Sequence, residues 1–119
     1  MKKNIQHEDF TEFKGIGHKE IILFSITSMS TDYTANMNFL ISRMYKVAKA
    51  NDIDVSIHMD SASKIESRGK NADIILLTPE LFAMLDEIQK KLPDKVVKVI
   101  DRKDYGFLNG EHVLKMALS

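Results

Sequence analysis

The residue types most able to do chemistry gather in one short stretch, Leu23–Tyr33, which reads LFSITSMSTDY. An apolar run ends there, and a cluster of hydroxyl groups leads into a predicted helix. Backbone N–H groups that curl toward a helix N-terminus form a concave surface that prefers an anion. The stretch therefore predicts a phosphate-binding loop, with ordinary helix capping by Thr31 or Asp32 as the alternative. The predicted loop comprises Ile26, Thr27, Ser28, Met29, Ser30, Thr31, Asp32 and Tyr33.

The composition favours one globular domain and excludes several kinds of chemistry. The chain has 119 residues, and its 17 basic and 17 acidic side chains balance, so it lacks the overall charge of a protein that binds nucleic acid or an anionic membrane. It contains no cysteine, which excludes disulfides, thiolate metal sites and thiol catalysis. No apolar stretch approaches the roughly 20 residues of a membrane span. We expect a soluble cytoplasmic protein without direct membrane insertion.

Holding this loop requires elements on both sides of it, and the hydrophobic pattern predicts them. Residues 32–50 carry apolar side chains at intervals typical of an amphipathic helix. Continuous apolar runs indicate strands buried on both faces, whereas the alternating segment 53–58 suits an edge strand. We expect strands at residues 20–24, 53–58, 73–77 and 96–100, and helices at residues 32–50, 61–68, 79–91 and 110–118.

Local signals refine the ends of these elements. Thr78 stands where a helix cap is expected, and Pro79 follows at the first helical position, where its missing N–H costs nothing. The segment 101–109 is predicted to be an irregular connection. Within it, Asp101 and Asp104 resemble a carboxylate pair, but capping of a turn is the favoured interpretation.

The first residues follow neither a helical nor a strand period. Residues 1–19 are predicted to form a flexible N-terminal extension that docks through Phe10 and Phe13. Residues 20–119 are predicted to form a single domain.

Strands that alternate with helices predict a parallel sheet with right-handed crossovers. We expect a flavodoxin-like three-layer α/β/α fold with a four-stranded parallel sheet in the order 2-1-3-4. Ligands of such sheets bind outside the carboxyl ends of the strands, where the strand order reverses. This places residues 25–32 beside Thr78, Pro79 and Glu80, which we assign, with Tyr105, to the rim that partners would contact.

Three segments match a family pattern in order and at the right spacing. Residues 25–32 read SITSMSTD, similar to C-x-x-G-M-S-T-S, and residues 72–81 read ADIILLTPEL, similar to A-D-V-I-L-L-G-P-Q. The third segment runs from Val99 to Glu111 and resembles V-I-D…D-Y-G-x-x-N-G-E. Together they make the segment Glu20–Ser119 resemble the IIB components of the lactose/cellobiose class of the bacterial sugar phosphotransferase system.

This resemblance implies a phosphoryl relay that needs no cofactor. In the family, the loop cysteine accepts phosphate from a phosphohistidine on the IIA component and passes it to a sugar held by the membrane IIC component. The partners implied are therefore IIA and IIC, and sugar selection resides largely in IIC. Ser25 occupies the cysteine position and is the catalytic residue that the resemblance assigns.

The loop departs from the pattern at more than the cysteine. Ser28 and Thr78 replace glycines, Asp32 stands where the family usually has a hydroxyl residue, and Glu80 stands where it usually has glutamine. A like charge about 5 Å from a phosphoryl group opposes it by roughly 2 to 4 kcal/mol near a protein surface. Two such carboxylates indicate weak phosphate binding. Native divergence and an engineered replacement of the cysteine remain alternative origins of Ser25.

These departures leave three functional hypotheses. The first is a IIB-type phosphoryl carrier that is impaired because serine replaces cysteine. The second is a noncatalytic IIB-like module that docks phosphotransferase proteins without carrying phosphate, to which an exposed Met29 with Tyr33 would contribute. The third is a loop that binds a free anion or a phosphosugar.

Other candidate sites are weaker. The four histidines lack the spacing of metal ligands, so no metal site is expected. His58 ends the second predicted strand and would lie near the functional edge. A flavin site would need aromatic residues that flank the flavin and a longer chain, and this sequence does not meet these requirements convincingly.

Overall fold

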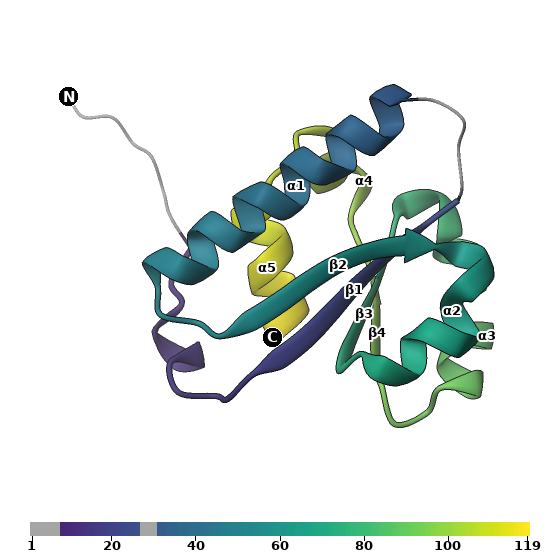
Figure 1. Ribbon diagram of the computed structural model, residues 1–119, viewed down its shortest axis with the longest axis horizontal. Coiled ribbons are helices and arrows are strands. Elements are labelled where there is room, and N and C mark those ends of the chain that lie inside the picture. Colours follow the sequence, from purple (N-terminus) through teal and green to yellow (C-terminus); the bar gives the residue numbers. More distant parts are fainter. Residues whose placement is uncertain (1–7, 27–30) are drawn as a thin grey trace.

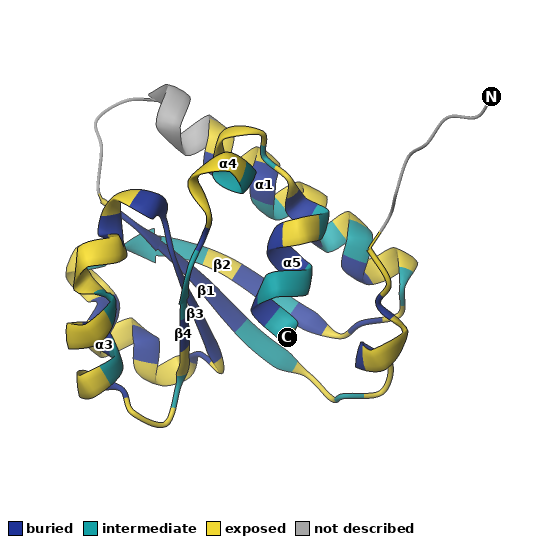
Figure 2. Cartoon of the chain, turned by 180° about the vertical axis from the view of Figure 1, so that it is seen from behind, coloured by how far each residue is buried: buried dark blue, intermediate teal, exposed yellow. Residues whose placement is uncertain are grey.

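Four short runs of mainly apolar residues pair into one parallel sheet in the order β2-β1-β3-β4 (Figure 1). The computed structural model describes residues 8–26 and 31–119, and the predicted strand order is confirmed within them. Central strands β1 and β3 are the most deeply buried, as Figure 2 shows. The strands are β1 (Lys19–Ser25), β2 (Val55–Ser61), β3 (Ile74–Leu77) and β4 (Val96–Val99).

Helices cover both faces of this sheet, which gives the predicted three layers (Figures 1 and 2). On one face lie α1 (Thr31–Ala50) and α5 (Gly110–Leu118), close to the predicted residues 32–50 and 110–118. On the other face lie α2 (Ile65–Arg68) and α3 (Leu85–Lys91). Short 3-10 turns flank these two helices: η2 (Ala62–Lys64), η3 (Gly69–Asn71) and η4 (Pro79–Met84).

Strand β1 belongs to two hydrophobic clusters at once. Ile21 and Leu23 pack in the cluster beneath α1 and α5. Ile22 and Phe24 pack in the cluster beneath α2 and α3. Because side chains alternate along a strand, this pattern fixes which face each following residue presents.

The N-terminal segment folds back onto the first cluster. A single 3-10 turn, η1 (Thr11–Phe13), places Phe10 and Phe13 in the core at 2% and 5% exposure. The Nζ atom of Lys115 lies 5.8 Å and 5.3 Å from the centres of these two rings. Phe10 and Phe13 thus dock against the domain as predicted. The flexibility of residues 1–19 stays a prediction.

Strand β2 is the edge strand that its alternation predicted, but it runs three residues further than expected, to Ser61. Leu23 and Phe24 of β1 pair with Met59 and Asp60, which continue the alternation of the strand although aspartate is depleted in strands. Helix α1 protects the outer edge, because the Ile57 N–H donates to the Tyr45 hydroxyl at 2.7 Å.

Two other predictions about elements are wrong. Residues 101–109 do not form an irregular connection throughout, since α4 (Arg102–Gly106) lies within them. This helix is too short to show a period, and its start depends on the Asp101 carboxylate, which accepts from the Lys103 N–H at 3.0 Å. Thr78 does not cap the next helix: its side chain makes no capping hydrogen bond, because the chain enters a tight 3-10 turn, η4, before α3.

Helices α1 and α5 approach so closely that only glycine fits at position 110. A Cβ atom on Gly110 would lie 2.6 Å from the Arg43 Cβ and 2.8 Å from the Met44 backbone nitrogen. Real side chains do not tolerate such distances, so the helices would have to move apart.

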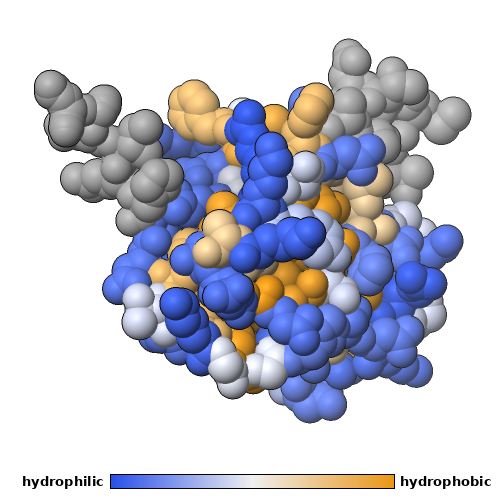
Figure 3. All heavy atoms as spheres, turned by 60° about the vertical axis from the view of Figure 1, so that its left-hand side comes forward, coloured by the Kyte–Doolittle hydropathy of each residue, from blue (hydrophilic) through white to orange (hydrophobic). Residues whose placement is uncertain are grey.

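On the surface seen in Figure 3, hydrophilic residues predominate and apolar residues gather near the centre.

We predict that Gly110→Ala lowers the free energy of unfolding by about 1 to 3 kcal/mol, the usual cost of overpacking. Gly106→Ala is the matched control, because a Cβ atom there meets nothing within 4 Å. Urea denaturation followed by circular dichroism measures both variants. Equal effects of the two substitutions would contradict the close approach.

Candidate functional site

Three hydroxyl-bearing residues lie in a row at the carboxyl ends of three neighbouring strands. Ser25 ends β1, where it is 8% exposed, and pairs with Ser61 at the end of β2. Thr78 follows β3 directly, and its N–H donates to the carbonyl of Phe24 at 3.1 Å. We call Ser61, Ser25 and Thr78 the hydroxyl row.

The residues of the hydroxyl row occupy the same face of the sheet. Alternation from Ile21 and Leu23 assigns Ser25 to the face that α1 and α5 cover. The same alternation applies to Thr78, whose backbone is still extended after β3, and to Ser61 at the end of β2. The topology therefore brings Ser25 and Thr78 together as predicted, and adds Ser61, which the sequence had placed in a helix.

Within the hydroxyl row, Ser25 lacks an activating partner among the side chains that the structure describes. No histidine, carboxylate or amine among the side chains of residues 8–26 and 36–119 hydrogen bonds to Ser25. The Ser61 hydroxyl accepts from the Ser63 N–H at 3.3 Å, so it is engaged in starting η2. Thr78 is fully buried, and its Oγ1 atom has no hydrogen-bond partner among the described residues. The side chains of residues 8–26 and 36–119 thus supply no general base to Ser25.

Helix α1 begins at this same edge, because it follows the carboxyl end of β1. Thr31, Asp32 and Tyr33 form the backbone of its first turn, so the partial positive charge of the helix N-terminus lies there. The predicted loop residues Thr27, Ser28, Met29 and Ser30 lie outside the described residues. Capping by Thr31 or Asp32 stays a prediction.

The rim of this edge offers exposed apolar surface. Ile26, which follows Ser25, is 49% exposed, and Phe82 in η4 is 68% exposed. An open hollow of about 410 Å³ lies between these 3-10 residues and the start of α4. Its lining residues are Pro79, Phe82, Val99, Ile100, Asp101 and Arg102. Glu80 is exposed beside it, so the rim presents both an apolar surface and a carboxylate.

The segment from Asp101 to Gly110 has mainly structural tasks. Asp101 caps α4, which confirms the turn-capping interpretation for this residue. Asp104 instead forms an ion pair with His112 at 2.8 Å. Asn109 caps α5, its Oδ1 accepting from the His112 N–H at 3.1 Å. Tyr105, assigned to the rim from the sequence, is half-buried against the core beneath α1 and α5.

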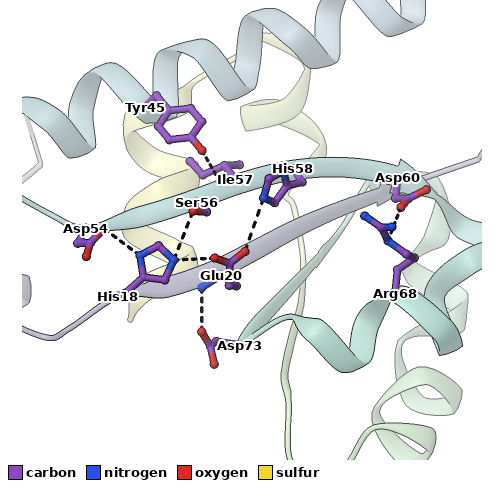
Figure 4. A network of polar contacts seen from close by, with 10 residues as sticks. All are labelled: His18, Glu20, Tyr45, Asp54, Ser56, Ile57, His58, Asp60, Arg68 and Asp73. Carbon is purple, nitrogen blue, oxygen red and sulfur yellow. Dashed lines mark hydrogen bonds and ion pairs between the residues drawn. The ribbon is translucent and has the colours of Figure 1, made fainter.

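A polar network that the sequence analysis missed lies at the opposite end of β1 and β2 (Figure 4). His18 contacts Asp54 at 2.8 Å and Glu20 at 2.6 Å, and these hydrogen bonds, that of Asp54 first, raise the pKa of His18. The Glu20 N–H donates to Asp73 at 2.8 Å. His58 lies 3.6 Å from Glu20, three residues before the end of β2.

The expectation that His58 lies near the functional edge is therefore wrong, because β2 continues past it. The signal that could have revealed this network is the alternation of Ser56 and His58 on β2, which the register places opposite Glu20 and Ile22. Within residues 8–26 and 31–119, no group of three or more histidines and carboxylates is arranged to hold a metal ion. No helix of the same residues has both the length and the apolar character needed to cross a membrane.

These features define a class: a doubly wound α/β protein with its candidate site where the strand order reverses, as in flavodoxin-like folds. The family model described as "PTS system, Lactose/Cellobiose specific IIB subunit" matches residues 20–116. The chain belongs to this family, which confirms the resemblance that its sequence motifs indicated.

Individual relatives agree with this assignment. The oligo-beta-mannoside-specific EIIB component of the phosphotransferase system of Bacillus subtilis (strain 168) is 27% identical over 103 residues, which cover 85% of this chain and 94% of that protein. A cellobiose-specific phosphotransferase IIB component from Borrelia burgdorferi has a similar structure, with a TM-score of 0.65, 28% identity and coverage of 87% and 92%. The lactose-specific IIB component domain from Streptococcus pneumoniae shares the fold, with a TM-score of 0.71, 12% identity and coverage of 86% and 96%.

We predict that the ion pair between Asp104 and His112 contributes to stability in a pH-dependent way. Its hydrogen bond with Asp104 raises the pKa of His112 above the ordinary 6.5. The contribution is therefore fully present below pH 6.5 and is lost as the pH rises through the pKa of the folded state. Because the His112 side chain is 48% exposed, the gain is no more than about 1 kcal/mol.

The measurement compares wild-type protein with His112→Gln by urea denaturation at a series of pH values. The difference in unfolding free energy is expected to be largest in mild acid and to shrink in mild alkali. The remaining histidines are common to both proteins and cancel. In an Asp104→Asn background the pH-dependent difference should disappear, and its persistence there would refute the assignment.

Proposed function

We propose that this chain is a IIB-type subunit of a cellobiose- or chitobiose-like phosphotransferase system whose phosphoryl transfer is impaired. The observation that carries the proposal is the position of Ser25, which is nearly buried at the carboxyl end of β1, the strand that precedes α1 in the chain. In this function a phosphohistidine of a IIA component is the donor, and a sugar at a membrane IIC component is the acceptor. A cytoplasmic location is part of the proposal, since the donor and the acceptor site meet there.

The impairment follows from the chemistry of a hydroxyl. In the first step the N–P bond of the donor breaks, an O–P bond to Ser25 Oγ forms, and the serine proton passes to the departing imidazole nitrogen. A thiol with an ordinary pKa of about 8.5 loses its proton readily beside a helix N-terminus, but a hydroxyl needs a base. No side chain of residues 8–26 or 36–119 hydrogen bonds to Ser25 as such a base.

The second step is less favourable still. The O–P bond to Ser25 must break while a bond to the sugar oxygen forms, and Ser25 Oγ must take up the proton of the sugar hydroxyl. An alkoxide is a poorer leaving group than a thiolate, because it is far more basic. A phosphoserine at position 25 would therefore trap the phosphoryl group rather than relay it.

A second candidate function is docking without chemistry. The observation that favours it is the exposed apolar surface that Ile26 and Phe82 present after the ends of β1 and β3. In this alternative the chain binds a IIA, a IIC or a regulatory protein through the same edge and carries no phosphate. The two candidates share the surface and differ only at Ser25.

We predict that Ser25→Cys restores phosphoryl acceptance from a phosphorylated IIA component, at a rate at least about 100-fold above that of the wild type. Intact-protein mass spectrometry measures the added phosphoryl group. Ser63→Cys is the matched control, since it adds a cysteine in η2, outside the end of β1. It should remain unmodified.

The outcomes separate the two functions. A phosphorylated Ser25→Cys protein supports the carrier. A Ser25→Cys protein that binds the IIA component yet gains no phosphoryl group supports the docking module and contradicts the carrier.

A further inference from the structure

The buried hydroxyl of Thr78 is the most unusual polar group in the described part of the chain. Thr78 has 0% exposure, and its Oγ1 atom has no hydrogen-bond partner among the described residues. Capping of η4 would be the obvious use of this hydroxyl, but the side chain makes no such bond. Burying an unpartnered hydroxyl costs free energy, so a group of this kind requires an explanation.

The position of Thr78 suggests which group would satisfy it. Its N–H donates to the Phe24 carbonyl, and the pairing of Phe24 with Leu77 makes Thr78 the lateral neighbour of Ser25. Alternation places both side chains on the face that α1 covers. The α1 N-terminus lies at the same edge and adds partial positive charge.

The spacing suits a tetrahedral oxyanion. Neighbouring strands lie about 4.7 to 4.9 Å apart, and a hydroxyl reaches a charged oxygen at roughly 2.5 to 2.8 Å. The two hydroxyls are thus close enough for one phosphate group to contact both, once the residues that bury Thr78 move aside to admit it.

We propose that the Thr78 hydroxyl is a phosphate-binding group that donates a hydrogen bond to a tetrahedral oxyanion held at Ser25. This inference rests on the proposed function for the location of the site, but it concerns binding and requires no covalent transfer. Thr78 stands where the family pattern has glycine, so this donor belongs to this chain rather than to the relay loop.

The test is a titration of the wild-type protein with inorganic phosphate at constant ionic strength, followed by amide NMR. The amides of Ser25 and Thr78 should shift and saturate. Thr78→Val, which keeps the shape and removes the hydroxyl, should bind phosphate about 10-fold more weakly, as expected for a lost hydrogen bond to a charged group. Thr78→Ser should retain most of the affinity. Thr11→Val, far along the chain in η1, is the matched control and should bind like the wild type.

A second measurement needs no ligand. Without phosphate, Thr78→Val should melt at a higher temperature than the wild type, because it removes an unpartnered buried hydroxyl. With saturating phosphate, this advantage should shrink, because the anion stabilises the wild type more. A structural role for the hydroxyl would instead lower the melting temperature of Thr78→Val in both conditions.

The inference is overturned if phosphate shifts neither amide in the wild type, if Thr78→Val binds phosphate as tightly, or if Thr78→Val is less stable without ligand. These results are independent of transfer from a IIA component. Phosphate binding that depends on Thr78, combined with a Ser25→Cys protein that accepts no phosphoryl group, would keep this inference and remove the carrier function.

Discussion

The burial of β1 on both faces is the constraint on which the rest of the structure depends. Ile21, Leu23 and Phe24 are 0% exposed and Ile22 is 4% exposed, so consecutive side chains enter two different hydrophobic clusters. A slip of one residue would exchange the two sets and misfit both clusters. The same burial that stabilises the sheet therefore fixes the end of the strand and presents Ser25 at its carboxyl edge.

The sequence predicted the sheet and its order because that information is carried by long, repeated patterns. The apolar runs, the period of α1 and the alternation of β2 each extend over several residues, and crossover rules then limit the topology. Helix α4 escaped prediction because it is a single polar turn whose start depends on one capping contact from Asp101. The end of β2 escaped because Met59 and Asp60 are ordered by pairing with β1 rather than by their own preference.

The candidate site was predictable in outline and not in detail. The rule that ligands bind where strand order reverses was enough to place Ser25 near Thr78. The sequence could not show that Thr78 is buried without a partner, because residues of its type before a proline are usually caps. Ser61 was missed for a related reason, since its place in the hydroxyl row depends on the true end of β2.

The two ends of β1 use polar groups in opposite ways. At the amino end, His18 and Glu20 are hydrogen bonded to partners on neighbouring segments, and these contacts fix the register at the surface (Figure 4). At the carboxyl end, Thr78 is fully buried, yet its Oγ1 atom has no hydrogen-bond partner among the described residues. Polar groups that served only stability would be paired most completely where they are most buried. Thr78 departs from this rule, which agrees with the proposal that it donates to a ligand at the carboxyl edge of the sheet.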